Sequence, residues 1–438
     1  MKTNQTTETL KARAKAILDE FTKQGVQAGE SSLTQSTLTE VCAEGGKLSM
    51  LRSNLSDHGK LKILQGGKKG QSDLTDFSDP RIREGVATAL ELSEVSQSDP
   101  AEGISELQEN QDFVVGPQDA DTEKMLDSMQ GLIQSVKEEY PKVSFDMAYL
   151  SHMLEDQVYA NTNGVVLSER RGYYRIIGTM VARDGDKTTS FDVLMTAFAS
   201  FDKPLIEQDG VRRKVDEITS QLDARQFTGK FEGDVILPPD MFVDVFYNMQ
   251  QGFLSDMSLI SGKSIWKEKL GQQVAIKGLN VSIDPGNSLL ASGSMLTSDG
   301  YVAKAQPLIQ DGNLASFALS RYGAAKTGLK RAGNDSMNFI VDAGKEKLED
   351  MIASVERGLL LKRFSGGGAS PAGDLSGVAK NSFIIEDGKI AYPVSETMVT
   401  SNVARMLMEI KALSEVRENI GRYLIPWAKI GGVTISGK

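Results

Sequence analysis

Pairs of turn-forming residues recur along this 438-residue chain, between short stretches in which apolar and polar residues alternate. The pairs are Gly45-Gly46, Gly66-Gly67, Asn163-Gly164, Asp184-Gly185, Asp299-Gly300, Asp311-Gly312 and Asp387-Gly388. Such dipeptides accept the positive φ angles of tight hairpin turns, and alternation is typical of strands with one buried face. The spacing therefore predicts antiparallel β-meanders in both halves of the chain.

Helical patterns flank these meanders. From Thr7 apolar residues recur at helical spacing until Gly25, and Asp79-Pro80 and Asp121 stand where helices begin. Further helices are expected over residues 207–223, from Pro238 and over 396–414. The pattern predicts an α+β fold with an N-terminal domain of layered helices and strands, residues 1–215, and a mainly β C-terminal domain, residues 216–438.

The charge balance excludes some classes of partner. The chain has 49 Lys and Arg against 59 Asp and Glu, a formal net charge of −10. Nucleic acids and anionic membranes are therefore not expected partners, because both are bound through clustered basic residues. A single cysteine, the absence of a signal-peptide pattern and the absence of an apolar run of about 20 residues predict a soluble cytoplasmic protein.

Few residues are suited to catalysis. There is no G-x-S-x-G motif, and Cys42 fits a buried strand position better than a nucleophile. His152 is expected to be structural, and His58 to be a solvated turn residue. Asp240 and Asp244 share a helical face and could bind a hard cation, although a solvated face is favoured. The glycine run from Gly366 lacks the Gly-Lys-Ser/Thr ending of a phosphate loop, which favours a flexible or closely packed backbone.

The second half carries motifs in an order that resembles the TldD/PmbA family of peptide-processing proteins, also called modulators of DNA gyrase. The similar segments are Gly262-Lys263-Ser264 followed by residues 270–275, residues 325–329 after Asp311-Gly312, residues 373–388, and Val433 to Gly437. The resemblance covers residues 230–438 well, and the N-terminal half by the order of its elements.

In one type of subunit of this family, a helix carries H-E-x-x-x-H, which binds zinc. Counting back from Gly262 places that helix at residues 247–252, where this chain has Tyr247, Asn248 and Gly252. The resemblance therefore implies a PmbA/TldE-type subunit. It implies no catalytic, cofactor-binding or metal-binding residue in this chain, with zinc supplied by the partner subunit.

The resemblance also implies a function. This chain is expected to be a non-catalytic subunit that pairs with a TldD-like zinc subunit in the cytosol, and the complex is expected to process or degrade unfolded peptides. The alternative is a stand-alone homodimer that binds peptides without cleaving them. An extended peptide could add to a strand edge by backbone pairing. The expected peptide-chamber loop contains Gly366, Gly367, Gly368, Gly373 and Asp374, because missing side chains let a backbone approach closely.

Overall fold

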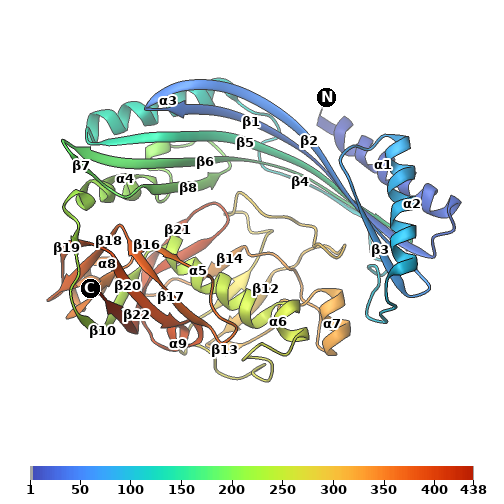
Figure 1. The fold of residues 1–438 in the computed structure, drawn as a ribbon. Helices are drawn as coiled ribbons and strands as arrows, with labels where there is room; N and C mark the ends of the chain where they lie inside the picture. The colour runs from blue at the N-terminus through green and yellow to red at the C-terminus, as the bar shows by residue number, and fades with distance from the viewer. Residues whose placement is uncertain (1–2, 438) are drawn as a thin grey trace.

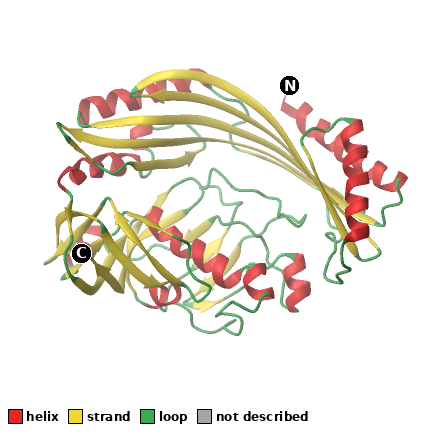
Figure 2. Ribbon diagram, viewed as in Figure 1, coloured by secondary structure: helices red, strands yellow, loops and turns green. Residues whose placement is uncertain are grey.

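The computed structural model describes residues 3–437 and contains two sheets with helices packed on them (Figures 1 and 2). The first sheet is long and curved. Its strands are β1 Ala28–Glu44, β2 Lys47–Gln65, β3 Lys68–Leu74, β4 Gln111–Val115, β5 Val143–Asn161, β6 Val166–Asp184, β7 Lys187–Thr188 and β8 Asp192–Phe198. They are ordered β3-β2-β1-β5-β6-β4, with β7 and β8 also pairing with β6. All these pairs are antiparallel except β4 with β6. The predicted α+β fold is confirmed.

The turns lie where the sequence predicts them, but the strands are longer. Gly45, Gly46, Gly66 and Gly67 all have positive φ angles, between +54° and +75°, at the ends of β2. β1 has 17 residues and β2 has 19, whereas the sequence pattern predicts short stretches. The centre of β1 is rich in Ser and Thr, and that of β2 is largely polar, so neither shows a clear apolar alternation, although Thr is favoured in strands. His58 therefore lies within β2, opposite Thr34, and its predicted turn position was wrong.

Helices cover the two ends of this sheet separately. α1 (Thr3–Lys23) and α2 (Asp79–Val95) pack around Leu33 and Leu61 at one end. α3 (Thr122–Glu139) packs with Leu150 and Ile176 at the other. The three predicted helices are confirmed, and they lie toward opposite ends of the curved sheet (Figure 1). One sheet therefore carries two hydrophobic cores. Cys42, 2% exposed, is buried as predicted.

The second sheet lies across the concave side of the first (Figure 1). Its strands are β9 Arg225–Gln226, β10 Lys230–Leu237, β11 Val281–Ile283, β12 Gln306–Gln310, β13 Asn313–Leu314, β14 Phe339–Val341, β15 Arg357–Leu360, β16 Arg363–Gly366, β17 Asp374–Lys380, β18 Ser382–Glu386, β19 Lys389–Ser395, β20 Thr397–Asn402, β21 Ile410–Asn419 and β22 Leu424–Ser436. The main order is β13-β12-β11-β14-β22-β10-β15-β18-β19-β9. β22 lies at its centre and also pairs with β20 and β21.

Short helices complete this half. They are α5 Pro239–Met249, continued by the π-helical turn Gln250–Leu254, then α6 Asp256–Ile260, α7 Arg321–Thr327, α8 Leu348–Ala353 and α9 Val403–Met408. The helix expected over residues 396–414 was wrong, because only α9 is helical there. Thr397 and Val399 are buried at a spacing of two, and β20 pairs with both β17 and β22. None of the helices within residues 3–437 has the length and apolar character that a membrane span requires.

The segment between the two sheets contains α4, Val211–Thr219, flanked by the 3₁₀ turns Leu205–Glu207 and Ser220–Asp223. Val211, Val215 and Ile218 bury the apolar side of α4 in the core at the α3 end of the first sheet. The proposed domain boundary at residue 215 falls within this helix, and it stays a prediction.

The polar side of α4 is bound to the C-terminal half by a network of charged residues. Arg213 contacts both carboxylate oxygens of Glu418 at 3.0 and 2.9 Å, and Asp240 at 3.1 Å. Its guanidinium also lies 5.2 Å from the centre of the Trp427 ring. Lys214 adds a 2.5 Å contact to Asp240. Since Asp240 is in the first turn of α5, the network fixes where that helix begins.

Replacing Arg213 by Ala should destabilise the protein by about 3 kcal/mol or more, because Glu418 and Asp240 lose their shared cation in a mostly buried site. Arg212→Ala is the matched control. Arg212 is the neighbouring residue of the same helix and its ion pairs are more exposed, so its loss should cost about 1 kcal/mol or less. Urea denaturation of both variants measures the difference. Equal midpoints would contradict the structural importance of the network.

Candidate functional site

α5 and the glycine run from Gly366 form opposite walls of one cavity of about 240 Å³. Pro239 occupies the first turn of α5, and Phe242 and Phe246 bury one side of the helix in the core. The other side presents Asp244, Tyr247 and Asn248 to the cavity. The remaining lining is largely apolar and includes Leu361, Phe364, Leu375 and Met406. The cavity therefore combines an apolar floor with a polar helical wall.

Asn248 joins the helix to the glycine run. Its side-chain nitrogen donates to the backbone oxygen of Asp244 at 2.7 Å. Its side-chain oxygen accepts the backbone N–H of Ala369 at 2.8 Å. Both ends of the carboxamide are thus engaged, and the glycine run is held against α5.

The three successive glycines have different surroundings. A Cβ on Gly366 would lie 2.6 Å from the Phe364 ring and 2.7 Å from the backbone oxygen of Ser376. A Cβ on Gly368 would make an ordinary 3.7 Å contact with Asn248, and one on Gly367 would meet no atom within 4 Å. Close packing therefore explains Gly366 alone, whereas Gly367 borders open space in the cavity.

Three of the predicted site residues are not among those that line this cavity. Gly252 lies in the π-helical turn after α5. Gly373 has a φ of +93°, and a Cβ there would lie 2.8 Å from Phe253, which indicates a role in packing. Asp374 accepts a hydrogen bond from the Asn402 side chain at 2.9 Å at the start of β17. The structure thus brings together Tyr247, Asn248 and Gly366 to Gly368, and any contact of these residues with peptide stays a prediction.

Of the two carboxylates on α5, only Asp244 is solvated as the sequence favours, because Asp240 pairs with Arg213 and Lys214. Burial alone would raise the pKa of Asp240, but Lys214 and Arg213 hold it below its ordinary value. Asp244 reaches solvent but has no cationic partner among residues 3–437. The surrounding protein and the nearby Asp240 raise the pKa of Asp244 to about 6. Asp244 is the functional candidate that the sequence analysis undervalued, because nothing in its spacing reveals the missing counter-ion.

The α5 face does not fit zinc. Protein zinc sites need three or four converging His, Cys or carboxylate ligands. Here the face offers one carboxylate, a phenol and an amide whose oxygen already accepts an N–H. In the part of the chain that the structure describes, no group of three His, Cys, Asp or Glu could hold a metal ion. His152 is buried and contacts the backbone oxygen of Pro117 at 2.9 Å, as expected of a structural histidine.

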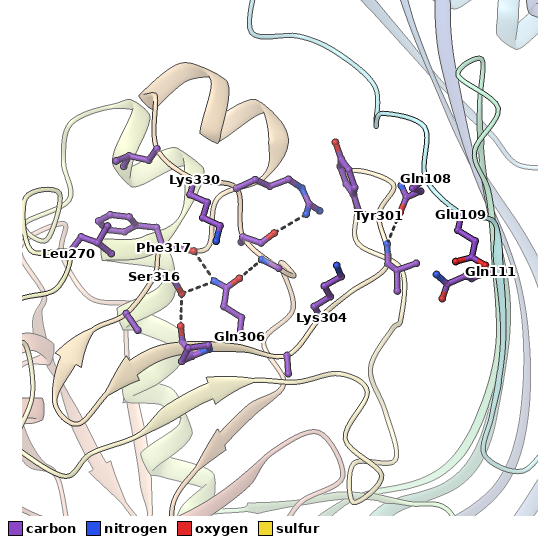
Figure 3. Close-up of a pocket in the computed structure, with 18 residues that line it drawn as sticks. Gln108, Glu109, Gln111, Leu270, Tyr301, Lys304, Gln306, Ser316, Phe317 and Lys330 are labelled. Atoms are coloured by element: carbon purple, nitrogen blue, oxygen red, sulfur yellow. Dashed lines mark hydrogen bonds between the residues drawn. The ribbon is translucent and has the colours of Figure 1, made fainter.

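A second, larger cavity of about 920 Å³ lies between the two halves (Figure 3). Residues 108–111 approach it from the first half, and Tyr301, Lys304 and Lys330 line it from the second. Arg331 is held by Asp299 at 2.6 Å. The sequence analysis missed this cavity because its lining comes from distant segments that carry no shared motif.

Comparison with known proteins gives consistent results. Residues 228–437 match the protein family described as "PmbA/TldA metallopeptidase C-terminal domain". A metalloprotease PmbA homolog of Haemophilus influenzae is 24% identical over 396 residues, which is 85% of each chain. A metalloprotease TldD homolog of the same organism is 25% identical over 169 residues, 35% of each chain.

One solved structure shows the same fold over nearly the whole length. TldE from Thermococcus kodakarensis matches with a TM-score of 0.84 and 17% sequence identity, covering 95% of this chain and 98% of its own. At that identity the likeness concerns the fold alone.

Two valine substitutions separate packing from open space in the glycine run. Gly366→Val should destabilise the protein by about 1–3 kcal/mol, because the new side chain would overlap Phe364 and the Ser376 carbonyl. Gly367→Val should change stability by no more than about 0.5 kcal/mol, because space is free there. Thermal unfolding of the two variants checks this. Equal losses would mean that Gly367 is also closely packed.

Asp244→Asn should stabilise the protein at alkaline pH and have little effect near pH 4. The folded-state pKa of about 6 lies above the ordinary value of 3.8, so the folded protein loses stability as pH rises between these values. The Asn side chain cannot ionise, so the variant avoids that loss of stability. The gain in stability is modest because Asp244 reaches solvent. Unfolding midpoints at acid and alkaline pH should be compared with those of Asp127→Asn, an exposed carboxylate on α3. An equal gain in stability at acid and alkaline pH would contradict the raised pKa of Asp244.

Proposed function

The C-terminal half of this chain belongs to the PmbA/TldD family of metallopeptidases, and we propose that the protein is a subunit without its own catalytic zinc site. In this proposal it pairs with a TldD-type subunit that holds the zinc, and the complex cleaves unfolded peptides. The observation that carries the proposal is the α5 face. Where the resemblance places a zinc-binding helix, Asp244, Tyr247 and Asn248 point into the cavity and do not form a zinc ligand set.

The role of Asn248 supports this proposal. Its carboxamide holds Ala369 in place, so the α5 position serves to shape the cavity wall rather than to bind an ion. The relatives support the pairing, since Haemophilus influenzae has homologs named PmbA and TldD.

The cavity suits an unfolded peptide better than a compact ligand. Its floor is apolar, which favours burial of a peptide side chain, and the free space at Gly367 lets a second backbone approach. Recognition through backbone groups and one apolar side chain needs no fixed sequence in the peptide. Such recognition is what a degradative or processing complex requires.

The purified chain should contain no stoichiometric zinc and should not cleave unfolded peptides by itself. Adding a TldD homolog from the same organism should give a complex that co-purifies and cleaves. Elemental analysis, gel filtration and a fluorogenic-peptide assay measure these outcomes. One zinc per chain, retained through gel filtration of the chain alone, would overturn the proposal.

Gly367→Val tests the cavity within that complex. The variant should assemble and bind zinc through the partner as the wild type does, but cleave peptide more slowly, because valine fills the space beside the backbone. Gly131→Val on α3 is the matched control for added bulk, since a Cβ there also meets no atom within 4 Å. If the two variants cleave equally fast, the peptide does not use this cavity. A homodimer that binds peptide without any TldD homolog would favour the stand-alone alternative.

A further inference from the structure

A third cavity, of about 470 Å³, lies between the concave face of the first sheet and loops of the C-terminal half. The side chains of Glu155 and Tyr173 line it from β5 and β6, and Arg422 lines it from the turn between β21 and β22. Its volume is within the range of about 300–1,000 Å³ typical of small-ligand sites. Both halves of the chain therefore contribute to one polar cavity.

Glu155 and Tyr173 are neighbours on the same face of the sheet. Glu155 of β5 lies directly opposite Arg171 of β6, and Tyr173 is two residues further along β6. Successive side chains of a strand alternate between faces, so Arg171 and Tyr173 point the same way. The carboxylate and the phenol are thus diagonal neighbours on the cavity floor.

The three polar groups have no partner in the described part of the chain. No hydrogen bond or ion pair within residues 3–437 involves the side chains of Glu155, Tyr173 or Arg422. Arg171 does not neutralise Glu155, because it contacts Glu169 at 2.8 Å, and Glu169 also accepts from Ser294 at 2.8 Å. Burial raises the pKa of Glu155 and Glu169 adds to the effect, while the charges of Arg171 and Arg175 oppose it. A half-buried carboxylate that makes no ion pair or hydrogen bond is costly, so it favours a cationic ligand.

Arg422 supplies the opposite charge at the same place. Burial raises the pKa of Tyr173 and Glu155 raises it further, whereas Arg175 and Arg422 oppose this. Glu155, Tyr173 and Arg422 all line the same cavity. Asn338 also lines the cavity, and its side-chain oxygen is buried without a hydrogen-bond partner within residues 3–437. A carboxylate, a phenol and a guanidinium together suit a ligand with one positive and one negative end.

We propose that this cavity binds a short zwitterionic peptide, with its ammonium group on Glu155 and its carboxylate on Arg422. Tyr173, the diagonal neighbour of Glu155, can donate to the same carboxylate. Hydrolysis of a peptide bond produces one new ammonium and one new carboxylate end, so products of peptide cleavage are zwitterionic. The assignment extends the proposed function by naming the ligand class of a second site.

The place of the cavity in the fold agrees with this role. Arg422 is followed by Tyr423, whose ring stacks on Phe339 at 6.1 Å between centres. Phe339 in turn lies 6.0 Å from Phe246 of α5 between ring centres. Residues 422–423 therefore link the lining of this cavity to the core on which α5 packs.

Isothermal titration calorimetry of the full chain with trialanine tests the assignment. Trialanine should bind at one site, and N-acetyl-trialanine and trialanine amide should each bind at least about tenfold more weakly. The Glu155→Gln variant should bind trialanine and N-acetyl-trialanine with equal affinity, because the partner of the ammonium group is gone. The Arg422→Gln variant should likewise bind trialanine and trialanine amide with equal affinity, because the partner of the carboxylate is gone. Glu91→Gln and Arg83→Gln on the exposed side of α2 are the matched controls and should bind like the wild type.

Several outcomes would overturn the proposal. They are no binding of trialanine at millimolar concentration, equal binding of the blocked analogues, or loss of affinity in the α2 controls. Free alanine that binds as tightly as trialanine would instead assign the cavity to amino acids. The analogues test the wild-type chain, so the result stands even if a variant fails to fold. Because no cleavage is measured, failure here is distinct from failure of the zinc-subunit proposal.

Discussion

The contact of Arg213 with Glu418 and Asp240 fixes the start of α5 against the first half of the chain. It joins α4, whose apolar side belongs to the first sheet, to the first turn of α5 in the second half. α5 then carries the polar wall of the candidate site. The same network leaves Asp244 as the unmatched carboxylate, since both nearby cations are engaged by Asp240 and its neighbours. A structural ion cluster thus sets the electrostatics of a cavity one helical turn away.

Much of the fold could be predicted because its signals are local. Helix starts such as Asp121, whose side chain accepts the Lys124 N–H, and turns such as Gly45-Gly46 depend on residues close in sequence. The length of β1 and β2 could not be predicted, since their largely polar centres are ordered by pairing with neighbouring strands. Residues 396–414 were misassigned for a related reason. β20 and β21 are both extended because β22 pairs with each of them.

The candidate site was only partly predictable from the sequence. Tyr247, Asn248 and the glycine run were singled out separately, but the bond from Ala369 to Asn248 joins residues 121 positions apart. No local pattern encodes such a contact. Likewise, the lone charge of Asp244 and the facing charges of Glu155 and Arg422 become visible only when the positions of all nearby ions are known. Sequence patterns identify residue types well, whereas a missing partner is a property of the folded arrangement.

The central position of β22 has a consequence for how this protein is made. In the main strand order, β22 alone connects β14, and the strands beyond it, to β10 and its neighbours. Those strands span residues 225–395, yet β22 begins at Leu424, so the ribosome must release almost the whole second half before its sheet can close. The first sheet is built from residues 28–198 and can close much earlier in synthesis. The emerging second half therefore spends most of its translation time with open strand edges, and it is the part of the nascent chain that most needs chaperone protection.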